Sequence, residues 1–159
     1  MRLRGLLRGL PRPRSHADGA LMAVPVRHLV LDNEAASALL SDAPHDAKRR
    51  EVIAAVMAAN GRCAVPTAVR CEAWWRRIDP AAANANRLVP IDDPLDRAGA
   101  DRDVELCRAV PSASLVDAAV AVAAERLPPV DVVEVLTSDP GELRQLATYL
   151  DVAVDVQRL

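Results

Sequence analysis

Four acidic residues stand where a parallel α/β sheet would bring their carboxylates together. Asp32 and Asp139 lie at the ends of apolar runs that predict strands, and Glu72 and Asp117 lie in apolar stretches that predict helices. Carboxylate oxygens are the ligands that Mg²⁺ and Mn²⁺ prefer in proteins. The grouping therefore indicates a divalent-metal site formed by these four side chains.

Asp32 and Asp139 have a second interpretation as helix N-caps. Aspartate is among the preferred N-cap residues, and proline is favoured at the position that follows the cap. The Asp-Pro pair occurs at Asp79, Asp93 and Asp139, so capping alone would explain it. Asp139 differs from Asp79 because it follows a strongly apolar run, and α/β sheets bind ligands beyond the carboxyl ends of their strands.

Asp117 and Glu72 also have structural alternatives. Asp117 is the single charge in residues 115–124, which are otherwise apolar on all sides and predict a buried helix. A buried carboxylate needs an ion pair, hydrogen bonds or a metal. A capping box with Ser114 would satisfy Asp117, and an ion pair with Arg76 would satisfy Glu72. Taken together, four acids so placed favour one pocket over four separate roles.

The elements that must position these acids alternate along the chain. Five apolar strands interleaved with helices predict an α/β three-layer sandwich, with a central five-stranded parallel sheet covered on both faces. The expected strands are 28–31, 63–65, 88–91, 131–137 and 152–156. The expected helices are 33–40, 45–59, 67–77, 79–87, 93–109, 114–126 and 139–150.

Length and composition indicate one globular domain. The chain has 159 residues, of which 51% are hydrophobic and 26% charged, and the formal net charge is −2. No apolar run approaches the roughly 20 residues that cross a bilayer, so we do not expect a membrane protein. A net charge of this sign does not favour nucleic-acid binding through one large basic face.

The N-terminal segment differs from the remainder. Residues 1–25 are basic and rich in proline and glycine, so we expect a disordered tail there, with Met22 as an alternative start, and a folded domain over 26–159. No apolar stretch of about 7–15 residues follows the arginines, which argues against a secretory signal. The three cysteines have no metal-ligand or redox spacing, which is typical of a reducing compartment. We therefore expect a cytoplasmic protein.

Four short motifs in order resemble the PIN-domain ribonucleases, and among them the VapC-like toxins of type II toxin–antitoxin pairs. The resemblance covers about residues 27–156 and rests on the following stretches: Val30-Leu31-Asp32, Thr67-Ala68-Val69-Arg70-Cys71-Glu72, Ser114-Leu115-Val116-Asp117-Ala118-Ala119-Val120-Ala121, and Leu136-Thr137-Ser138-Asp139. It implies a PIN-like fold in which Asp32, Glu72, Asp117 and Asp139 are the catalytic metal ligands, supported by hydrogen bonds from Thr137 or Ser138.

The same resemblance implies an activity and partners. The enzyme would be an endoribonuclease that uses Mg²⁺ or Mn²⁺ to hydrolyse RNA phosphodiester bonds, leaving 5′-phosphate and 3′-hydroxyl ends. It would form a homodimer and bind a small antitoxin whose C-terminal segment lies across the acidic cleft.

Two positions depart from the family pattern. The family usually has a small hydroxyl or amide residue two places after the first acid, where this chain has Glu34, an additional carboxylate for the site. Its last motif often continues with a second aspartate and an aromatic residue, whereas Pro140-Gly141-Glu142-Leu143 follow Asp139 here. Either departure would weaken the activity or alter the metal preference.

Two basic clusters are candidates for holding RNA. The first comprises residues 48–50, and the second comprises Arg70, Arg76 and Arg77 beside the tryptophan pair 74–75, where an unpaired base could stack. The alternatives are a solvated helix face for the first cluster and a core or dimer contact for the tryptophans.

Other functions remain open. A PIN-like domain that has lost activity and serves as a binding module is one alternative. An aspartate-dependent phosphatase of the haloacid-dehalogenase type, or a receiver domain, is another, because both have an acid after their first strand. Both also need a lysine late in the chain, whereas Lys48 is the only lysine here.

Overall fold

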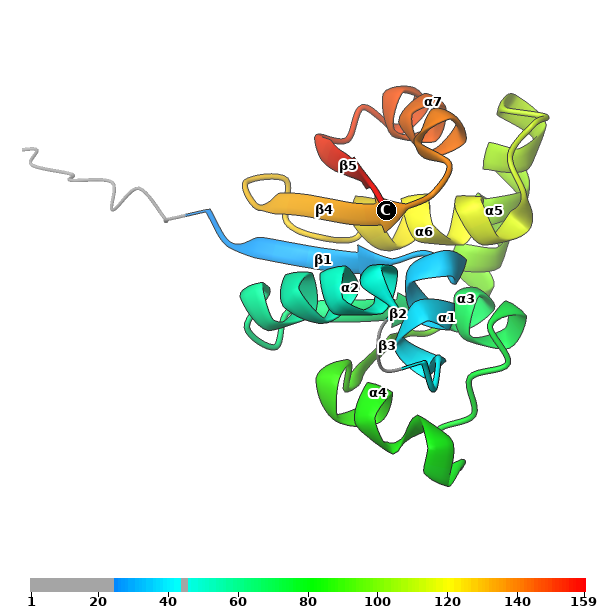
Figure 1. The fold of residues 1–159 in the computed structure, drawn as a ribbon. Helices are drawn as coiled ribbons and strands as arrows, with labels where there is room; N and C mark the ends of the chain where they lie inside the picture. The colour runs from blue at the N-terminus through cyan, green and yellow to red at the C-terminus, as the bar shows by residue number, and fades with distance from the viewer. Residues whose placement is uncertain (1–24, 44–45) are drawn as a thin grey trace, which may run out of the picture.

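Five short segments form one all-parallel sheet with the strand order β3-β2-β1-β4-β5 (Figure 1). The computed structural model describes residues 25–43 and 46–159. Apart from Pro25, the N-terminal tail expected over 1–25, including Met22, lies outside the described residues. The strands are β1 (Arg27–Leu31), β2 (Cys63–Pro66), β3 (Ile91–Asp93), β4 (Val132–Thr137) and β5 (Val154–Arg158).

Seven α-helices and one short 3₁₀-helix connect the strands in the described part of the chain. In Figure 1, α1 and α2 pack in front of the sheet and α6 lies behind it, which confirms the expected α/β three-layer sandwich. The helices are α1 (Asn33–Leu40), α2 (Ala47–Ala58), α3 (Thr67–Glu72), α4 (Ala83–Leu88), α5 (Arg97–Ala109), α6 (Leu115–Glu125) and α7 (Pro140–Leu150), with the 3₁₀-helix η1 at Pro80–Ala82.

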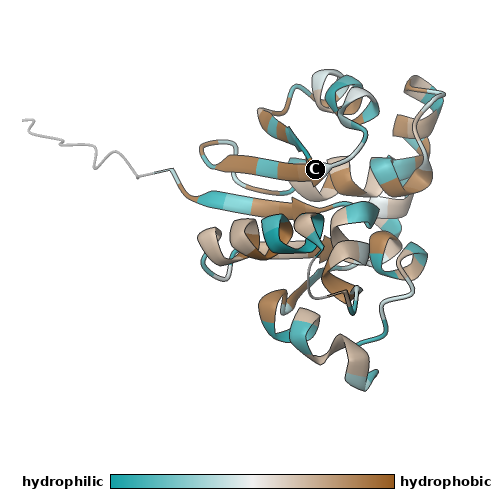
Figure 2. Ribbon diagram, in the orientation of Figure 1, coloured by the Kyte–Doolittle hydropathy of each residue, from teal (hydrophilic) through white to brown (hydrophobic). Residues whose placement is uncertain are grey.

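The hydrophobic core lies between the central strands and α6. Leu29, Val30 and Leu31 of β1 are at most 1% exposed, and every residue from 118 to 124 in α6 is buried. Hydrophobic residues accordingly colour the end of β1, much of β4 and α6 in Figure 2. Central parallel strands are apolar on both sides because helices cover both faces of the sheet.

Three helices differ from the sequence prediction, and polar contacts relocate the ends of two of them. The helix expected over 79–87 is divided into the 3₁₀-helix η1 and α4. The helix expected over 67–77 ends at Glu72, since Trp74 adopts a left-handed backbone (φ 55°) and the Trp75 N–H donates to the Arg70 carbonyl at 2.9 Å. The helix expected from 93 begins at Arg97. Asp96, not Asp93, is its N-cap and accepts a hydrogen bond from the Gly99 N–H at 2.7 Å.

Two strands are also displaced from their expected positions. β3 occupies Ile91–Asp93 instead of 88–91, which places Pro90, a residue without an N–H, before the strand. β5 occupies Val154–Arg158 instead of 152–156, because Asp151 (φ 56°) and Val152 still complete the end of α7 through hydrogen bonds to its last turn. No helix in the described part of the chain combines the length and apolarity that a membrane crossing requires.

Candidate metal centre

The strand order reverses between β1 and β4, which are central neighbours although they are far apart in sequence. Such a switch point opens a crevice at the carboxyl ends of the two strands, where α/β sheets bind ligands. The register pairs Leu31 with Leu136, so Asp32, directly after β1, lies level with Thr137, the last residue of β4. Asp139 follows two residues later.

Asp32 is the most buried acid of the site. Its residue is 7% exposed, and its Oδ1 accepts a hydrogen bond from the Ala35 N–H at 2.8 Å as the N-cap of α1. Burial raises the pKa of Asp32, and the charge of Asp117 raises it further. The Ala35 N–H, the Thr137 hydroxyl and the Lys48 ammonium oppose that rise in pKa.

Asp117 occupies the third position of α6 and forms a capping box with Ser114. Its Oδ2 accepts from the Ser114 N–H at 3.0 Å and from the Ser114 hydroxyl at 2.6 Å, while the Asp117 N–H donates to Ser114 Oγ at 3.1 Å. The capping-box interpretation is therefore correct. It does not remove the charge from the site, because Asp117 raises the pKa of both Asp32 and Glu142.

Asp139 lies exposed at the N-cap of α7, where its Oδ1 accepts from the Gly141 N–H at 3.2 Å. The Asp139 N–H in turn donates to Thr137 Oγ1 at 3.0 Å. The same Thr137 hydroxyl opposes the rise in the pKa of Asp32.

Glu142, in the first turn of α7, is a fourth acid of the cluster. From the sequence it was expected only as part of the departure from the family pattern after Asp139. Burial raises its pKa, and Asp117 and Asp139 raise it further through their charges. The proximity of the Asp117 carboxylate therefore disfavours the charged form of Glu142. A signal was present in the sequence, because Asp139 and Glu142 have the spacing of an N-cap and the third helical residue, the spacing of a capping box.

Glu72 does not lie inside an apolar helix as expected. It is the last residue of α3, it is exposed, and it makes no hydrogen bond or ion pair with the described residues. The alternative ion pair with Arg76 is also wrong, because Arg76 pairs with Asp79 at 3.6 Å. The charges that shift the pKa values of Asp32 and Glu142 do not include that of Glu72.

Glu34 forms an ion pair with Lys48 of α2. The Glu34 carboxylate is thus neutralised by the only lysine of the chain. The charge of this lysine also opposes the rise in the pKa of Asp32. Lys48 consequently belongs to the environment of the acidic cluster, in addition to lying in the basic cluster 48–50.

The three aspartates share one arrangement. Each accepts a backbone N–H at the start of a helix of eight or more residues through one carboxylate oxygen: Asp32 Oδ1 and Asp139 Oδ1 as the N-caps of α1 and α7, and Asp117 Oδ2 in the capping box of α6. The second oxygen of each carboxylate makes none of these capping bonds. Hydrogen-bonded carboxylates are typical metal ligands, because the bonds orient the free oxygen.

The donor set fits a hard divalent cation by its chemistry, since every member is a carboxylate or hydroxyl oxygen. The raised pKa values of Asp32 and Glu142 reflect burial and like-charge repulsion that a cation would relieve. As the side chains stand in residues 25–43 and 46–159, no three histidine, cysteine, aspartate or glutamate side chains are arranged to hold a metal ion.

Some of the candidate RNA-binding side chains are engaged in contacts within the protein, whereas Trp74 is exposed to solvent. Arg70 and Arg77 both donate to the Asp92 carboxylate, at 2.8 and 2.6 Å, and Trp75 is buried with its indole N–H on Asn86. The alternative of a core contact is therefore correct for Trp75. Trp74, in contrast, is 88% exposed.

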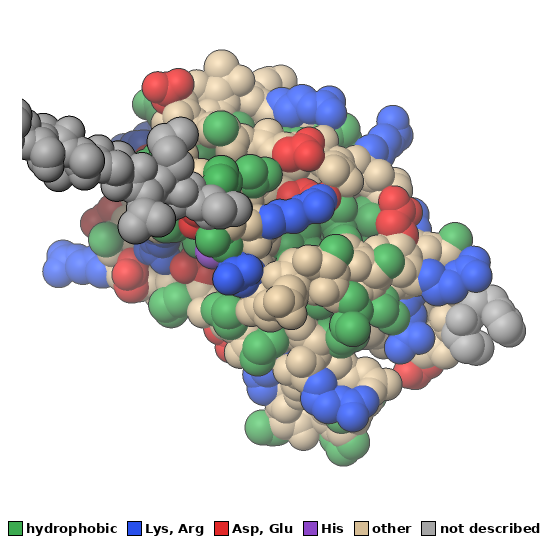
Figure 3. All heavy atoms as spheres, turned by 90° about the vertical axis from the view of Figure 1, so that its left-hand side faces the viewer, with side chains coloured by type: hydrophobic (Ala, Val, Ile, Leu, Met, Phe, Trp, Pro, Cys, Tyr) green, Lys and Arg blue, Asp and Glu red, His purple; other side chains and the backbone are tan. Residues whose placement is uncertain are grey.

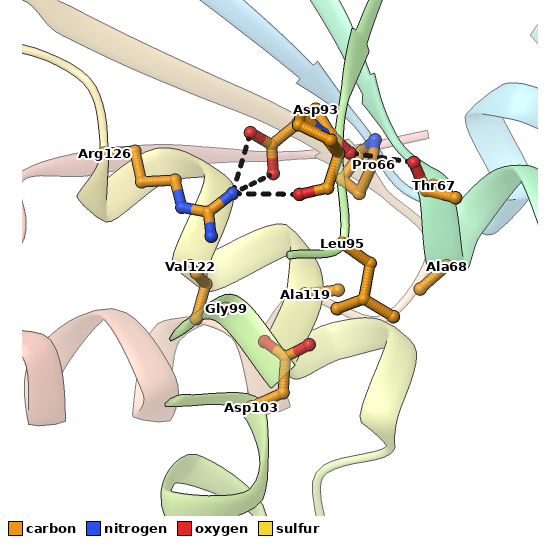
Figure 4. A pocket seen from close by; sticks show the side chains of 11 residues that line it. Pro66, Thr67, Ala68, Asp93, Leu95, Gly99, Asp103, Ala119, Val122 and Arg126 are labelled. Atoms are coloured by element: carbon orange, nitrogen blue, oxygen red, sulfur yellow. Dashed lines mark hydrogen bonds and ion pairs between the residues drawn. The ribbon is translucent and has the colours of Figure 1, made fainter. Parts of the chain in front are cut away.

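A second polar pocket lies at the carboxyl ends of β2 and β3, between α5 and α6 (Figure 4). Asp103 points into it, is 1% exposed, and has no hydrogen-bond partner for either carboxylate oxygen among the described residues. Arg126 at the rim is held by Asp93 at 3.1 Å and by Asp96 at 2.9 Å. The pocket measures about 10 Å³, room for roughly one water molecule.

The opposite edge of the sheet, where the strands begin, has a different surface. Basic, acidic and hydrophobic side chains are interspersed over the described part of that face (Figure 3). There His28 pairs with Asp131 at 2.9 Å, and Arg27 pairs with Glu134. The clustering of acids is thus a feature of the carboxyl edge.

Comparisons with models of known protein families, with curated proteins and with solved structures found no match to this chain.

Proposed function

We propose that this chain is a divalent-metal-dependent endoribonuclease of the PIN-like type. One observation carries the proposal: Asp32, Asp117, Asp139 and Glu142 lie at the starts of α1, α6 and α7, near enough for the charge of Asp117 to raise the pKa of both Asp32 and Glu142. A cluster of acids favours hard cations, and helix N-termini favour the negative charge of a phosphate. A phosphodiester held by metal ions satisfies both preferences.

The residues of the chain have distinct tasks in this proposal. The Ala35 N–H holds Asp32 and the Ser114 hydroxyl holds Asp117, so that one oxygen of each carboxylate is oriented for a cation. Bound Mg²⁺ or Mn²⁺ would activate a water and polarise the scissile phosphate. The N–H groups at the starts of α1, α6 and α7 favour negative charge at this edge. Glu142 takes the place that the resemblance had assigned to Glu72.

The experiment is cleavage of a mixed single-stranded RNA pool by the purified protein in Mn²⁺ or Mg²⁺, with EDTA as the metal-free control. Asp117→Asn should abolish cutting, because the amide preserves the cap but removes the charge. Asp96→Asn is the matched control, since the Asp96 carboxylate also accepts a backbone N–H at a helix start but lies outside the cluster. Equal cutting by wild type and Asp117→Asn would refute the proposal.

The same assay ranks the two glutamates. Glu142→Gln should reduce the cleavage rate more than Glu72→Gln, because only Glu142 interacts with the aspartates in the described structure. A larger loss in Glu72→Gln would return Glu72 to the site and imply that α3 moves toward the aspartates when RNA binds.

A PIN-like binding module without activity is a second candidate, favoured by the exposed position of Glu72 and by the absence of three acids arranged for a metal in the described residues. Isothermal titration with Mn²⁺ separates the two candidates, because a module has no need of tight metal binding. A receiver domain is less compatible, since its strand order is 2-1-3-4-5 and this sheet has β3-β2-β1-β4-β5.

We also propose that the protein is the toxin of a toxin–antitoxin pair, acts in the cytoplasm as a homodimer, and is inhibited by a small antitoxin across the acidic cleft. The support is the sequence resemblance. Coexpression with the product of the neighbouring small gene should give a copurifying complex in which RNA cleavage is suppressed, and light scattering gives the number of copies. Failure to associate would count against the toxin role.

A further inference from the structure

Trp74 occupies a backbone position that is poorly suited to tryptophan. The N–H of Trp75 donates to the Arg70 carbonyl at 2.9 Å and that of Trp74 to the Cys71 carbonyl at 3.3 Å, which is the hydrogen-bond pattern of a Schellman motif ending α3. Its left-handed residue is usually glycine, because a side chain is strained there. Here that residue is Trp74, with φ 55°.

The indole of Trp74 makes little contact with the rest of the protein that would offset this backbone strain. It is 88% exposed, whereas the adjacent Trp75 is 2% exposed and hydrogen-bonded to Asn86. Ile78, four residues further on, is 77% exposed. A large aromatic side chain held outward at a strained position points to a role in binding, since strain of this kind concentrates at functional sites.

Trp74 borders a hollow of about 430 Å³, which is within the size range of small-ligand sites. Three arginines also line it: Arg70 and Arg77 share the single carboxylate of Asp92, and Arg76 is only loosely paired with Asp79 at 3.6 Å. The guanidinium groups therefore outnumber their carboxylate partners, and the excess positive charge suits a phosphate.

We propose that this hollow binds one unpaired nucleotide of a single-stranded RNA, with the base stacked on Trp74 and the phosphate held by Arg76. Stacking on an aromatic side chain combined with arginine contacts is how proteins hold single strands. α3 lies against α1 and α6, two of the helices whose N-termini bear the acidic cluster, so a strand bound in the hollow runs at the same end of the sheet (Figure 1). The choice of RNA as ligand rests on the proposed function.

The test measures binding of the full chain to a single-stranded oligo(A) of about ten nucleotides in EDTA, where no metal-dependent cutting occurs. Trp74→Gly should weaken the affinity about tenfold or more, as expected for the loss of one stacked base. It should not lower the melting temperature, because glycine suits the left-handed position. Trp74→Tyr should retain most of the affinity. Tyr149→Ala removes another exposed aromatic side chain, on α7, and should leave the affinity unchanged.

Cys71 provides a second readout. It lines the same hollow and is exposed, while Cys63 is buried and burial raises the pKa of the half-buried Cys107. The oligonucleotide should therefore protect Cys71 from alkylation in the wild type but not in Trp74→Gly.

The two proposals fail separately. Unchanged oligonucleotide affinity in Trp74→Gly, with Cys71 unprotected, would overturn the stacking site and leave the hollow to a protein partner, even if the enzyme cuts RNA. Loss of affinity in Trp74→Gly without any metal-dependent cleavage by the wild type would support the stacking site and refute the nuclease.

Discussion

Each aspartate of the cluster has a structural role and a free charge. Asp32, Asp117 and Asp139 satisfy backbone N–H groups with one oxygen, which is the role that a capping residue has in any helix. Capping and metal binding are therefore compatible at these positions. Asp→Asn changes separate them, since asparagine also caps well but is a poorer partner for a divalent cation.

The first prediction concerns metal-dependent stability. Mn²⁺ at about 100-fold above its dissociation constant should raise the melting temperature of the wild type by roughly 5–10 °C, because a ligand that binds only the native state stabilises it. The rise should be much smaller for Asp117→Asn and unchanged for Asp96→Asn. Differential scanning calorimetry measures the shift, and equal shifts in all three proteins would exclude the acidic cluster as the binding site.

A second residue-scale prediction concerns Asp103, which lies outside the cluster. Burial without a hydrogen-bond partner raises its pKa to about 6; Asp93 adds to the rise and Arg126 opposes it. Because the native pKa exceeds that of the unfolded chain, this group stabilises the fold below about pH 4 and loses that contribution as the pH rises through about 6. Asp103→Asn should therefore be more stable than the wild type at about pH 8, by roughly 1–3 kcal/mol.

The measurement is urea unfolding of both proteins between about pH 5 and pH 8, a range that brackets the raised pKa. The difference in free energy of unfolding should shrink toward the acidic end. A difference that does not change with pH would mean that Asp103 is ionised in both the native and the unfolded protein across this range, so that its native pKa is not raised.

At the scale of elements, the boundaries that the sequence predicted well are those with local signals. α1 and α7 match their predicted bounds because Asp32 and the Asp139-Pro140 pair mark their starts. α3 ended early because its stop is a left-handed Trp74, a conformation that no propensity assigns to tryptophan. β3 and the start of α5 were displaced because Asp93 is bound by the distant Arg126.

The conformation of the segment that follows α3 is held by the carboxylate of Asp92. Asp92 of β3 accepts hydrogen bonds from Arg70 and Arg77. Arg77 also donates to the Val89 carbonyl at 2.6 Å, and its guanidinium carbon lies 4.8 Å from the centroid of the Trp75 ring. Asp92→Ala should lower the free energy of unfolding by about 1–3 kcal/mol, because it leaves two half-buried guanidinium groups without their acceptor. Asp79→Ala, which removes the exposed pair with Arg76, should cost less than about 1 kcal/mol.

Chemical denaturation of the two variants tests this contrast. Equal losses would mean that the Asp92 contacts are no stronger than an exposed ion pair, and that apolar packing of the buried Trp75 fixes the segment instead.

At the scale of the whole molecule, the alternation of apolar strands and helices was sufficient to predict a parallel sheet in three layers. It was not sufficient to predict the strand order, which depends on where each crossover returns. The placement of Asp32, Asp117 and Asp139 followed from that alternation. The position of Glu72 did not follow from it, because the end of α3 is set by tertiary contacts. Glu142 was missed because the charges that act on it include Asp117 of another element.

The sheet should also be unequally stable across its width. β1 and β4 pair on both sides and are buried, whereas β3 is a three-residue edge strand whose residues are at least partly exposed. Amide hydrogen exchange should therefore be slowest in residues 29–31 and 133–136 and fastest among the strands in 91–93. Mass-spectrometric exchange resolves these peptides, and protection in β3 equal to that in β1 would indicate that a second chain covers this edge.

Lys48 is a site at which the acidic edge of the sheet can be modified selectively. It is the only lysine of the chain and it pairs with Glu34, so any reagent or acetyltransferase that modifies lysine side chains can act at this one position. Acetylation would remove the positive charge that lowers the pKa of Asp32 and would leave Glu34 without its counter-ion. A single amide bond formed at Lys48 would thus add one net negative charge beside the proposed metal site.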